Sequence, residues 1–281
     1  MKSIKPPKVR DKFIVTGLAS QFPDDLAIDI KIFREQYLSF FKNKGDPWGV
    51  CGQNLNESVT KRIKGLYSRP RPNMGYIEQI RLRLSPDVCP MCGSAGAGQV
   101  DHYLPQADYA EFSIFSRNLV PACPNCNNGR RTAVKGASHP ARAMHPYYDQ
   151  FLEDTLFKAV FEGDYAEPSI TIELVDDQHP QKEILLFHKE NVLQKNNQLE
   201  GWLDASWGKF VETPRKVIDV YLDGKKAKKK NITKALKRFE HSKSEVEFGT
   251  PNNWWSILLI GILEDDQLLK WLVKNYRNST Y

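Results

Sequence analysis

Apolar residues in the first eighty positions recur at three- and four-residue steps, the period of an amphipathic helix. The clearest example is 28–41 (IDIKIFREQYLSFF), and segments 56–67 and 77–84 follow the same pattern. Between the last two lies a turn-rich stretch, 68–75 (SRPRPNMG), whose arginines either contact phosphate or only solubilise an exposed loop. We therefore predict a helical region over residues 1–84.

The pattern after residue 148 predicts a mainly helical C-terminal region, 149–281, with one small strand pair. Helices are expected at 149–161, 199–221, 232–244 and 253–276, and strands at 169–175 and 183–188. A lysine-rich link, 225–230, either solvates the surface or follows a nucleic-acid backbone. The apolar run 254–263 is too short to cross a bilayer, so we expect a buried helix and no membrane contact.

Composition places the chain among globular proteins that need neither a membrane nor export. It has 281 residues, of which 41% are hydrophobic and 26% charged, and a formal net charge of +6. No segment has the apolar run of a signal peptide, so a cytoplasmic protein is expected. The positive charge is compatible with a polyanionic partner but does not by itself identify one.

Four of the five cysteines form two C-x-x-C pairs, which is the spacing of a metal site. Each short loop can supply two corners of a tetrahedron, and in a reducing compartment such pairs more often bind zinc than form disulfides. A closed four-thiolate site leaves no position for water, so the predicted zinc ion is structural. The fifth cysteine, Cys51, stands apart. The predicted ligands are Cys89, Cys92, Cys123 and Cys126.

The residues around these cysteines read CPMC, then QVDHYLP, then NLVPACPNCNNGRR. In this order the chain resembles the HNH endonuclease family over part of segment 85–148. The resemblance implies a ββα-metal fold, in which a β-hairpin and a helix hold one divalent metal ion. It also implies that Asp101 binds that metal, that His102 is the general base and that Asn118 braces the loop orienting the histidine. The last motif position falls on Asn127, which makes the chain an HNN variant.

The chemistry of phosphodiester hydrolysis suits these residue types. A neutral histidine can take a proton from water, and the oxygen ligands of Asp101 and Asn127 suit Mg²⁺ or Mn²⁺, which would neutralise the phosphate and the leaving oxygen. The next helix carries Arg130 and Arg131, which either bind a substrate phosphate or solvate the helix surface. The role of His145, just beyond the motif, stays open.

The fold class predicted is therefore α+β and mostly helical, with a central ββα-metal HNH nuclease core (85–148) stapled by zinc between helical flanks. The function predicted is a metal-dependent endonuclease acting on DNA in preference to RNA, in restriction or anti-phage defence. Because the chain contains no Walker loop, any ATPase or sensor protein would be a separate partner. The alternatives are a catalytically silent zinc-ribbon adaptor for nucleic acid or protein, and an RNase using the same site. The residues do not decide target specificity, strand number or oligomeric state.

Overall fold

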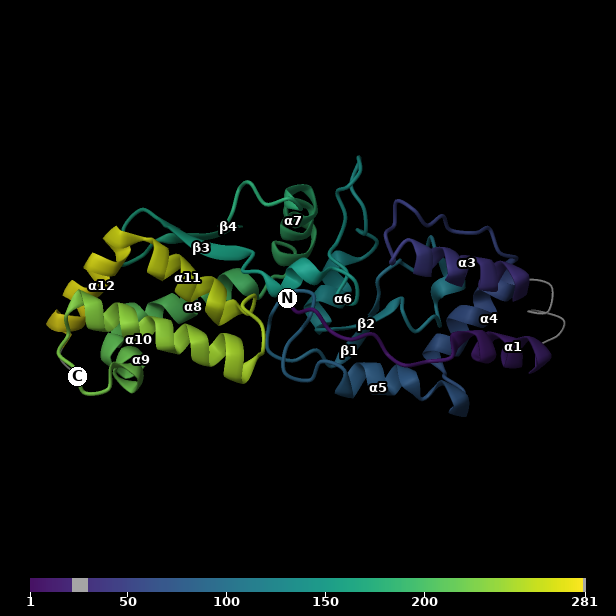
Figure 1. Cartoon of the computed structure of the whole chain (residues 1–281), viewed down its shortest axis with the longest axis horizontal. Helices are drawn as coiled ribbons and strands as arrows, with labels where there is room; N and C mark the ends of the chain where they lie inside the picture. Colours follow the sequence, from purple (N-terminus) through teal and green to yellow (C-terminus); the bar gives the residue numbers. More distant parts are fainter. Residues whose placement is uncertain (22–29, 280–281) are drawn as a thin grey trace.

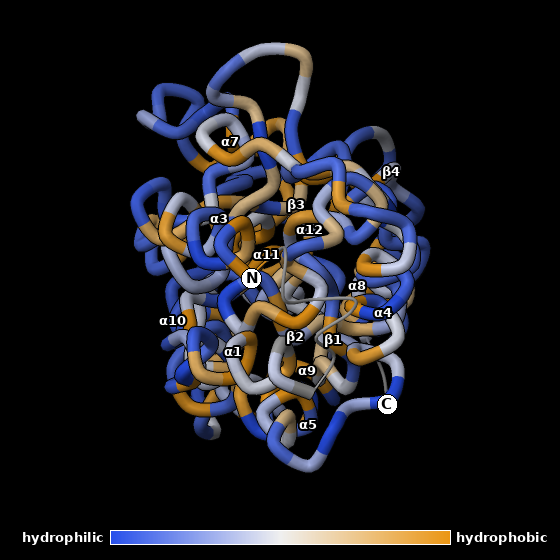
Figure 2. The backbone as a smooth tube through the Cα atoms, turned by 90° about the vertical axis from the view of Figure 1, so that its right-hand side faces the viewer, coloured by the Kyte–Doolittle hydropathy of each residue, from blue (hydrophilic) through white to orange (hydrophobic). Residues whose placement is uncertain are grey.

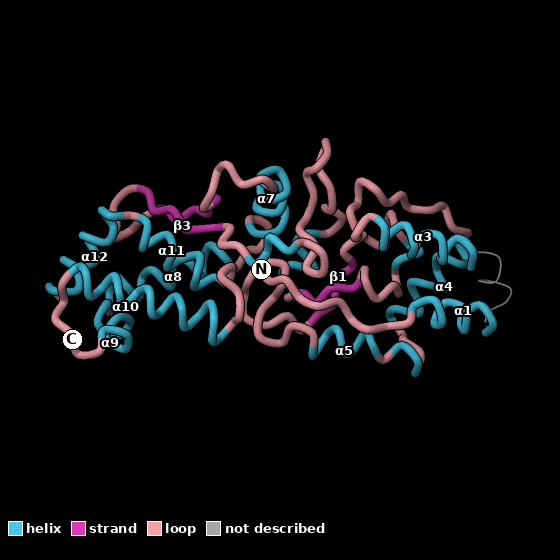
Figure 3. Tube along the Cα trace, viewed as in Figure 1, coloured by secondary structure: helices cyan, strands magenta, loops and turns pink. Residues whose placement is uncertain are grey.

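A computed structural model describes residues 1–21 and 30–279 as an elongated α+β protein (Figure 1). About half of the chain is helical, which is less than the mostly helical fold expected, and the described residues form two small two-stranded sheets (Figure 3). No helix in these residues has both the length and the apolar character needed to cross a membrane. The helices of the N-terminal part are α1 (Asp11–Gln21), α3 (Ile30–Lys42), α4 (Glu57–Ser68) and α5 (Tyr76–Arg83).

The predicted N-terminal helices are present with small shifts at their ends. Helix α4 begins after Asn56, whose side chain accepts the Ser58 N–H at 3.0 Å, a standard cap for a free backbone donor. Helix α3 matches the predicted segment 28–41 from residue 30 onward, and residues 28–29 lie outside the described part. Helix α5 packs against both strands of the first hairpin, whereas α3 and α4 contact the loop that connects these strands.

The middle of the chain forms a β-hairpin followed by a short helix. Strand β1 (Gln99–His102) pairs antiparallel with β2 (Leu119–Ala122), and α6 (Pro124–Arg130) follows directly. Proline is well placed in the first turn of α6, because the N–H that it lacks would have no partner within the helix. Figure 1 shows this unit between the N-terminal helices and the C-terminal helices.

The helix predicted at 149–161 is wrong: a short 3-10 turn, Gln150–Glu153, leads into strand β3 (Phe157–Glu162). Along β3 burial alternates, which is the period of a strand, and β4 (Ser169–Leu174) is its antiparallel partner. Helix α11 (Trp254–Glu264) covers this sheet closely. A Cβ at Gly261 would lie 2.1 Å from the Ala159 carbonyl oxygen, so glycine is required at that contact.

The strand predicted at 183–188 is also wrong, because these residues form helix α7 (Lys182–His188). Its buried side chains are Ile184, Leu185 and His188, a helical spacing that a run of apolar residues this short does not distinguish from a strand. The predicted strand 169–175 is confirmed as β4, but its partner comes from the chain before it.

Two predicted C-terminal helices are each divided in two. Segment 199–221 forms α8 (Leu199–Glu212) and α9 (Pro214–Leu222), since Pro214 cannot continue the ladder of helical hydrogen bonds. Segment 253–276 forms α11 and α12 (Asp266–Asn278), and the Asp265 side chain between them accepts the N–H groups of Gln267 and Leu268 at 2.9 Å. Helix α10 (Lys229–His241) confirms most of the prediction at 232–244.

One continuous apolar core joins these parts. Hydrophobic and hydrophilic residues alternate along the helices when the molecule is viewed down its long axis (Figure 2). The first residues of the chain run across its middle, where the Lys2 N–H donates to the Pro90 carbonyl at 3.1 Å and Lys2 Nζ donates to the Phe248 carbonyl at 2.7 Å. The segment before α1 therefore links the central hairpin region to the C-terminal helices.

Candidate functional site

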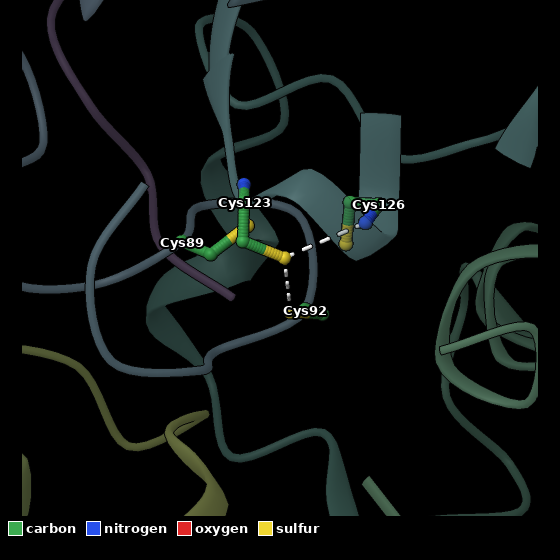
Figure 4. Close-up of side chains that lie close together, drawn as sticks. All are labelled: Cys89, Cys92, Cys123 and Cys126. Carbon is green, nitrogen blue, oxygen red and sulfur yellow. Dashed lines mark hydrogen bonds between the residues drawn. The ribbon is translucent and has the colours of Figure 1, made fainter. Parts of the chain in front are cut away.

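The four cysteines of the two C-x-x-C pairs meet in one buried cluster (Figure 4). Their Sγ atoms all lie within 4.8 Å of one another, and those of Cys92 and Cys123 are 3.8 Å apart. Backbone N–H groups point at two of the sulfurs: Cys123 donates to Cys89 Sγ at 3.3 Å and Cys126 to Cys123 Sγ at 3.4 Å. Four converging sulfurs with such donors could hold a zinc ion in a closed tetrahedral site.

The first cysteine pair sits in a tight turn that is packed against the C-terminal part. Gly93 has φ of +81°, and its N–H donates to the Cys89 carbonyl at 2.8 Å. A Cβ there would lie 2.1 Å from the Asn252 carbonyl oxygen, so only glycine suits both the turn and the contact. The cluster thus lies where the central unit and the residues before α11 touch.

Asp101 and Arg130 form a buried ion pair between β1 and α6. Both guanidinium donors, Nε at 3.0 Å and Nη2 at 2.7 Å, bind the same Asp101 oxygen, Oδ2. The remaining donors of Arg130 bind the backbone carbonyls of His102, Tyr103 and Ala133 at 2.7 to 3.2 Å. Burial raises the pKa of Asp101, and the neighbouring guanidinium opposes that rise.

This pairing corrects the role expected for Arg130. Its side chain is only 1% exposed and its donors all point inward, so it binds Asp101 instead of presenting a guanidinium to a phosphate. Arg131, the next residue, is exposed and lines an open polar hollow with Asn128, Lys195 and Asn197. Of the two predicted phosphate ligands, only Arg131 is placed to meet a ligand from solvent.

His102 lies on the opposite face of β1 from Asp101, as neighbours on a strand do. Its Nε2 is 2.9 Å from the Ser113 carbonyl oxygen, and the amide of Gln106 lies 3.0 Å from the same nitrogen. In the tautomer that carries its proton on Nε2, the ring donates to the Ser113 carbonyl, and Nδ1 is the nitrogen that can take up a proton. The Gln106 amide nitrogen is itself a donor and matches the other tautomer. Burial lowers the pKa of His102 to about 4, so the ring is neutral at pH 7.

Asn118 braces the loop that holds His102. Its Oδ1 accepts the Leu104 N–H at 2.7 Å, and its Nδ2 donates to the carbonyls of Leu104 at 3.0 Å and Phe112 at 3.3 Å. The side chain is fully buried. These bonds close the loop between β1 and β2, and the same loop carries the Ser113 carbonyl against His102.

Asn127 faces β1 from α6, where its Nδ2 donates to Gln99 Oε1 at 2.8 Å. Gln99 and Asp101 lie two residues apart and therefore share the face of β1 that α6 covers. The fold thus brings Asp101 and Asn127 to the same side of the hairpin. Together with His102 and Asn118, they form what we call the hairpin site.

The oxygen donors of the hairpin site match those that Mg²⁺ prefers. Arg130 binds Asp101 through Oδ2, and carboxylates that bind metals are commonly fixed by a second hydrogen-bonding group in this way. The set therefore fits a hard divalent ion in donor type. Within residues 1–21 and 30–279, however, the four cysteines are the only cluster of three or more cysteine, histidine or carboxylate ligands.

Two further residues contact His102, and the sequence alone does not identify either of them. Tyr67 of α4 packs edge-on against the His102 ring, with ring centroids 4.3 Å apart, although the two residues are distant in the chain. Ser113 contributes a backbone carbonyl, and its side-chain identity reveals nothing of that. His145, whose role was open, is a buried packing residue whose ring lies 4.1 Å from that of Tyr103.

Comparison with known proteins gives one partial relative. The chain is 38% identical over 108 residues to protein ea31 of Escherichia phage lambda, a stretch that covers 37% of this chain and 36% of ea31. The chain therefore matches only about a third of that relative's length, and the relative's name states no activity. No family model and no solved structure matches the chain.

Proposed function

We propose that this protein is an HNH-type endonuclease that hydrolyses phosphodiester bonds in DNA. The observation that carries the proposal is the hairpin site: a neutral His102 held by the Ser113 carbonyl at the end of β1, and a carboxylate and an amide held between β1 and α6. The four-cysteine cluster supports it, because it fixes the base of the hairpin and the start of α6.

The residues divide the chemistry among them. His102 Nδ1 takes the proton from the attacking water while Nε2 stays bonded to Ser113, so the ring keeps its direction as charge develops on it. Asn118 maintains that direction by closing the loop. Arg130 holds Asp101 in place through Oδ2. A divalent ion held by Asp101 and Asn127 would supply charge for the phosphate and for the leaving 3′ oxygen.

DNA is proposed as the substrate on the strength of the family resemblance, and RNA presents the same phosphodiester group to the same residues. We further propose a restriction or anti-phage role with a separate ATPase or sensor protein. The partial likeness to a phage protein carries no information on that role. Uncontrolled cutting would damage the host DNA, so a partner that controls access would be expected.

A zinc-ribbon adaptor without catalysis is the second candidate, and one observation favours it. The positive charge closest to Asp101 is already provided by Arg130, at 2.7 Å, and a guanidinium at this distance weakens the attraction of the carboxylate for a metal ion. The adaptor would keep the zinc cluster and the fold but would cut nothing.

Cleavage assays with a His102→Ala variant test the proposal. Supercoiled plasmid, single-stranded DNA and RNA are each incubated with Mg²⁺, Mn²⁺ or EDTA. We expect cleavage by wild type that requires metal, and a rate about 10²- to 10⁴-fold lower for His102→Ala, the usual contribution of a general base.

His241→Ala is the matched control, because His241 is exposed at the end of α10 and does not belong to the hairpin site. It should cut like wild type. If wild type with bound zinc cuts none of the substrates under any metal condition, the nuclease function is rejected in favour of the adaptor function. Equal cutting by wild type and His102→Ala would assign catalysis to another site.

A further inference from the structure

Helix α4 and the turn after it form a basic surface next to the hairpin site. Residues 57–71 contain five basic side chains and one acid, Glu57. Four of the five line a hollow of about 720 Å³ along the exposed side of the helix. The basic residues that line it are Lys61, Arg62, Arg69 and Arg71.

The hollow is open to solvent, and its lining combines charged side chains with Gly65 and Leu66. Gly65 lies in its wall, and a Cβ added there would meet no atom within 4 Å, so the helix backbone is accessible at that point. No carboxylate lines the hollow. In the part of the chain that the structure describes, neither Lys61 nor Arg69 forms an ion pair, so these two charges remain available to an anion.

The same helix touches the proposed catalytic histidine. Tyr67, two residues after Gly65, packs edge-on against His102 and donates from its hydroxyl to the Val100 carbonyl at 3.1 Å. Gly65, in the wall of the hollow, lies two residues, about 3 Å along the helix axis, from the residue in contact with His102, and the hollow is on the other side of the helix from that contact. From Lys61 to Arg69 the helix advances about 12 Å, and at about 3.4 Å per nucleotide this spans roughly three phosphates of one strand.

We propose that the α4 hollow binds the sugar–phosphate backbone of a nucleic acid and guides it to His102. The proposal rests on the nuclease function proposed above and adds the surface that positions its substrate. The recognition is electrostatic and independent of base sequence, because the hollow offers charged ends of long side chains and no rigid base-reading element.

Another basic surface, on α10, is less well placed. Lys234 and Lys237 are exposed there, but α10 packs against α9, α11 and α12 at the opposite end of the molecule. Figure 1 shows α10 among the C-terminal helices, on the other side of the β1–β2 hairpin from α4. A strand bound along α10 would not be led past His102.

The experiment measures binding in the absence of cutting. Fluorescent duplex DNA and single-stranded RNA are titrated with the His102→Ala protein in EDTA at several salt concentrations. Into this background we introduce Lys61→Ala with Arg69→Ala, or, as the control, Lys234→Ala with Lys237→Ala, which removes the same charge. A third variant, Lys61→Arg with Arg69→Lys, keeps both charges. Circular dichroism and zinc content confirm that each is folded.

The α4 double variant should bind about tenfold more weakly, and the slope of log affinity against log salt should become shallower by about two for duplex DNA, the loss of two phosphate contacts. The α10 control and the charge-keeping variant should bind within about twofold of the parent, since the lost attraction is electrostatic. Comparison of the DNA and RNA titrations identifies the preferred polymer.

Unchanged binding by the α4 variant, equal weakening by the α10 control, or no nucleic-acid binding at all would overturn the proposal. The outcome is separate from the cleavage test. If the α4 variant binds more weakly but wild type never cuts, the binding surface is supported and the nuclease function is rejected. If wild type cuts but the α4 variant binds normally, the nuclease function is supported and the binding surface is rejected.

Discussion

Individual residues of the hairpin site hold their positions through buried hydrogen bonds. Arg130 uses its donors on one carboxylate and three carbonyls, and Asn118 closes a loop with its amide. A buried polar group destabilises the fold unless its donors and acceptors are paired. Removing one side chain therefore leaves the groups that it paired without a hydrogen bond. Substitutions here should therefore affect stability as well as activity.

Asn118→Ala should lower the free energy of unfolding by about 2 to 4 kcal/mol, because it leaves the Leu104 N–H and the Leu104 carbonyl without the partner that they have in a fully buried place. Denaturant unfolding monitored by circular dichroism measures this. Asn73→Ala is the control, since Asn73 is exposed and should change stability by less than about 0.5 kcal/mol. Equal stability of the two variants would show that Asn118 does not brace the loop.

The residue types of the site could be identified from the sequence, but their partners could not. The order of Asp101, His102 and Asn118 between the two cysteine pairs, with Asn127 directly after the second pair, pointed to one family of sites. The inward turn of Arg130 depends on carbonyls from a loop whose path the sequence does not reveal. An arginine one turn into a helix is ordinarily exposed, so the prediction that it binds phosphate was wrong.

At the scale of elements, the central unit is too small to be stable alone. Its strands have four residues each and α6 has seven, lengths at which isolated hairpins and helices are marginal in water. The four cysteines join the turn before β1 to the start of α6, and metal binding would contribute folding free energy directly.

Cys123→Ser should abolish stoichiometric zinc binding and lower the free energy of unfolding by about 4 kcal/mol or more, because loss of a structural metal belongs to the most damaging class of substitution. Elemental analysis and thermal unfolding measure the two effects. Cys51→Ser, at an exposed cysteine outside the cluster, should retain both zinc and stability. A wild-type protein that contains no zinc would contradict the structural assignment.

The sequence predicted several elements correctly where local signals were strong, as in α4 with its Asn56 cap. The prediction of one helix over 199–221 ran across Pro214, where the structure divides it into α8 and α9. The prediction from sequence failed at β3. The short segment 157–162 becomes a strand because β4 pairs with it and α11 covers it. Such tertiary partners override weak local preferences.

At the scale of the whole molecule, three buried histidines are kept neutral in three different places. Burial lowers the pKa of His102 to about 4 and that of His188 to about 3, and it lowers the pKa of His145 well below its ordinary value of 6.5. The unfolded chain takes up protons as pH falls through 6.5, whereas the folded chain does so only at much lower pH.

Stability should therefore fall as pH decreases from 6.5 toward 4, with little contribution from these histidines above pH 7. His145→Asn removes one of the three groups, and its unfolding free energy should depend less steeply on pH, by up to about 1.4 kcal/mol per pH unit between 4.5 and 6. Denaturant unfolding at a series of pH values measures both slopes. Zinc release in acid affects both proteins alike, so identical slopes would contradict the neutral, buried state of His145.

By itself the sequence determined which four cysteines come together in a cluster that could bind zinc, and it supplied the residue types of the hairpin site, because short, fixed spacings along the chain carry that information. Only the tertiary structure decided that α4 lies against His102, that Arg130 turns inward to Asp101, and that Asn252 meets the turn at Gly93. These contacts join residues far apart in the chain. They are set by how whole elements pack, and no local pattern of residues encodes that packing.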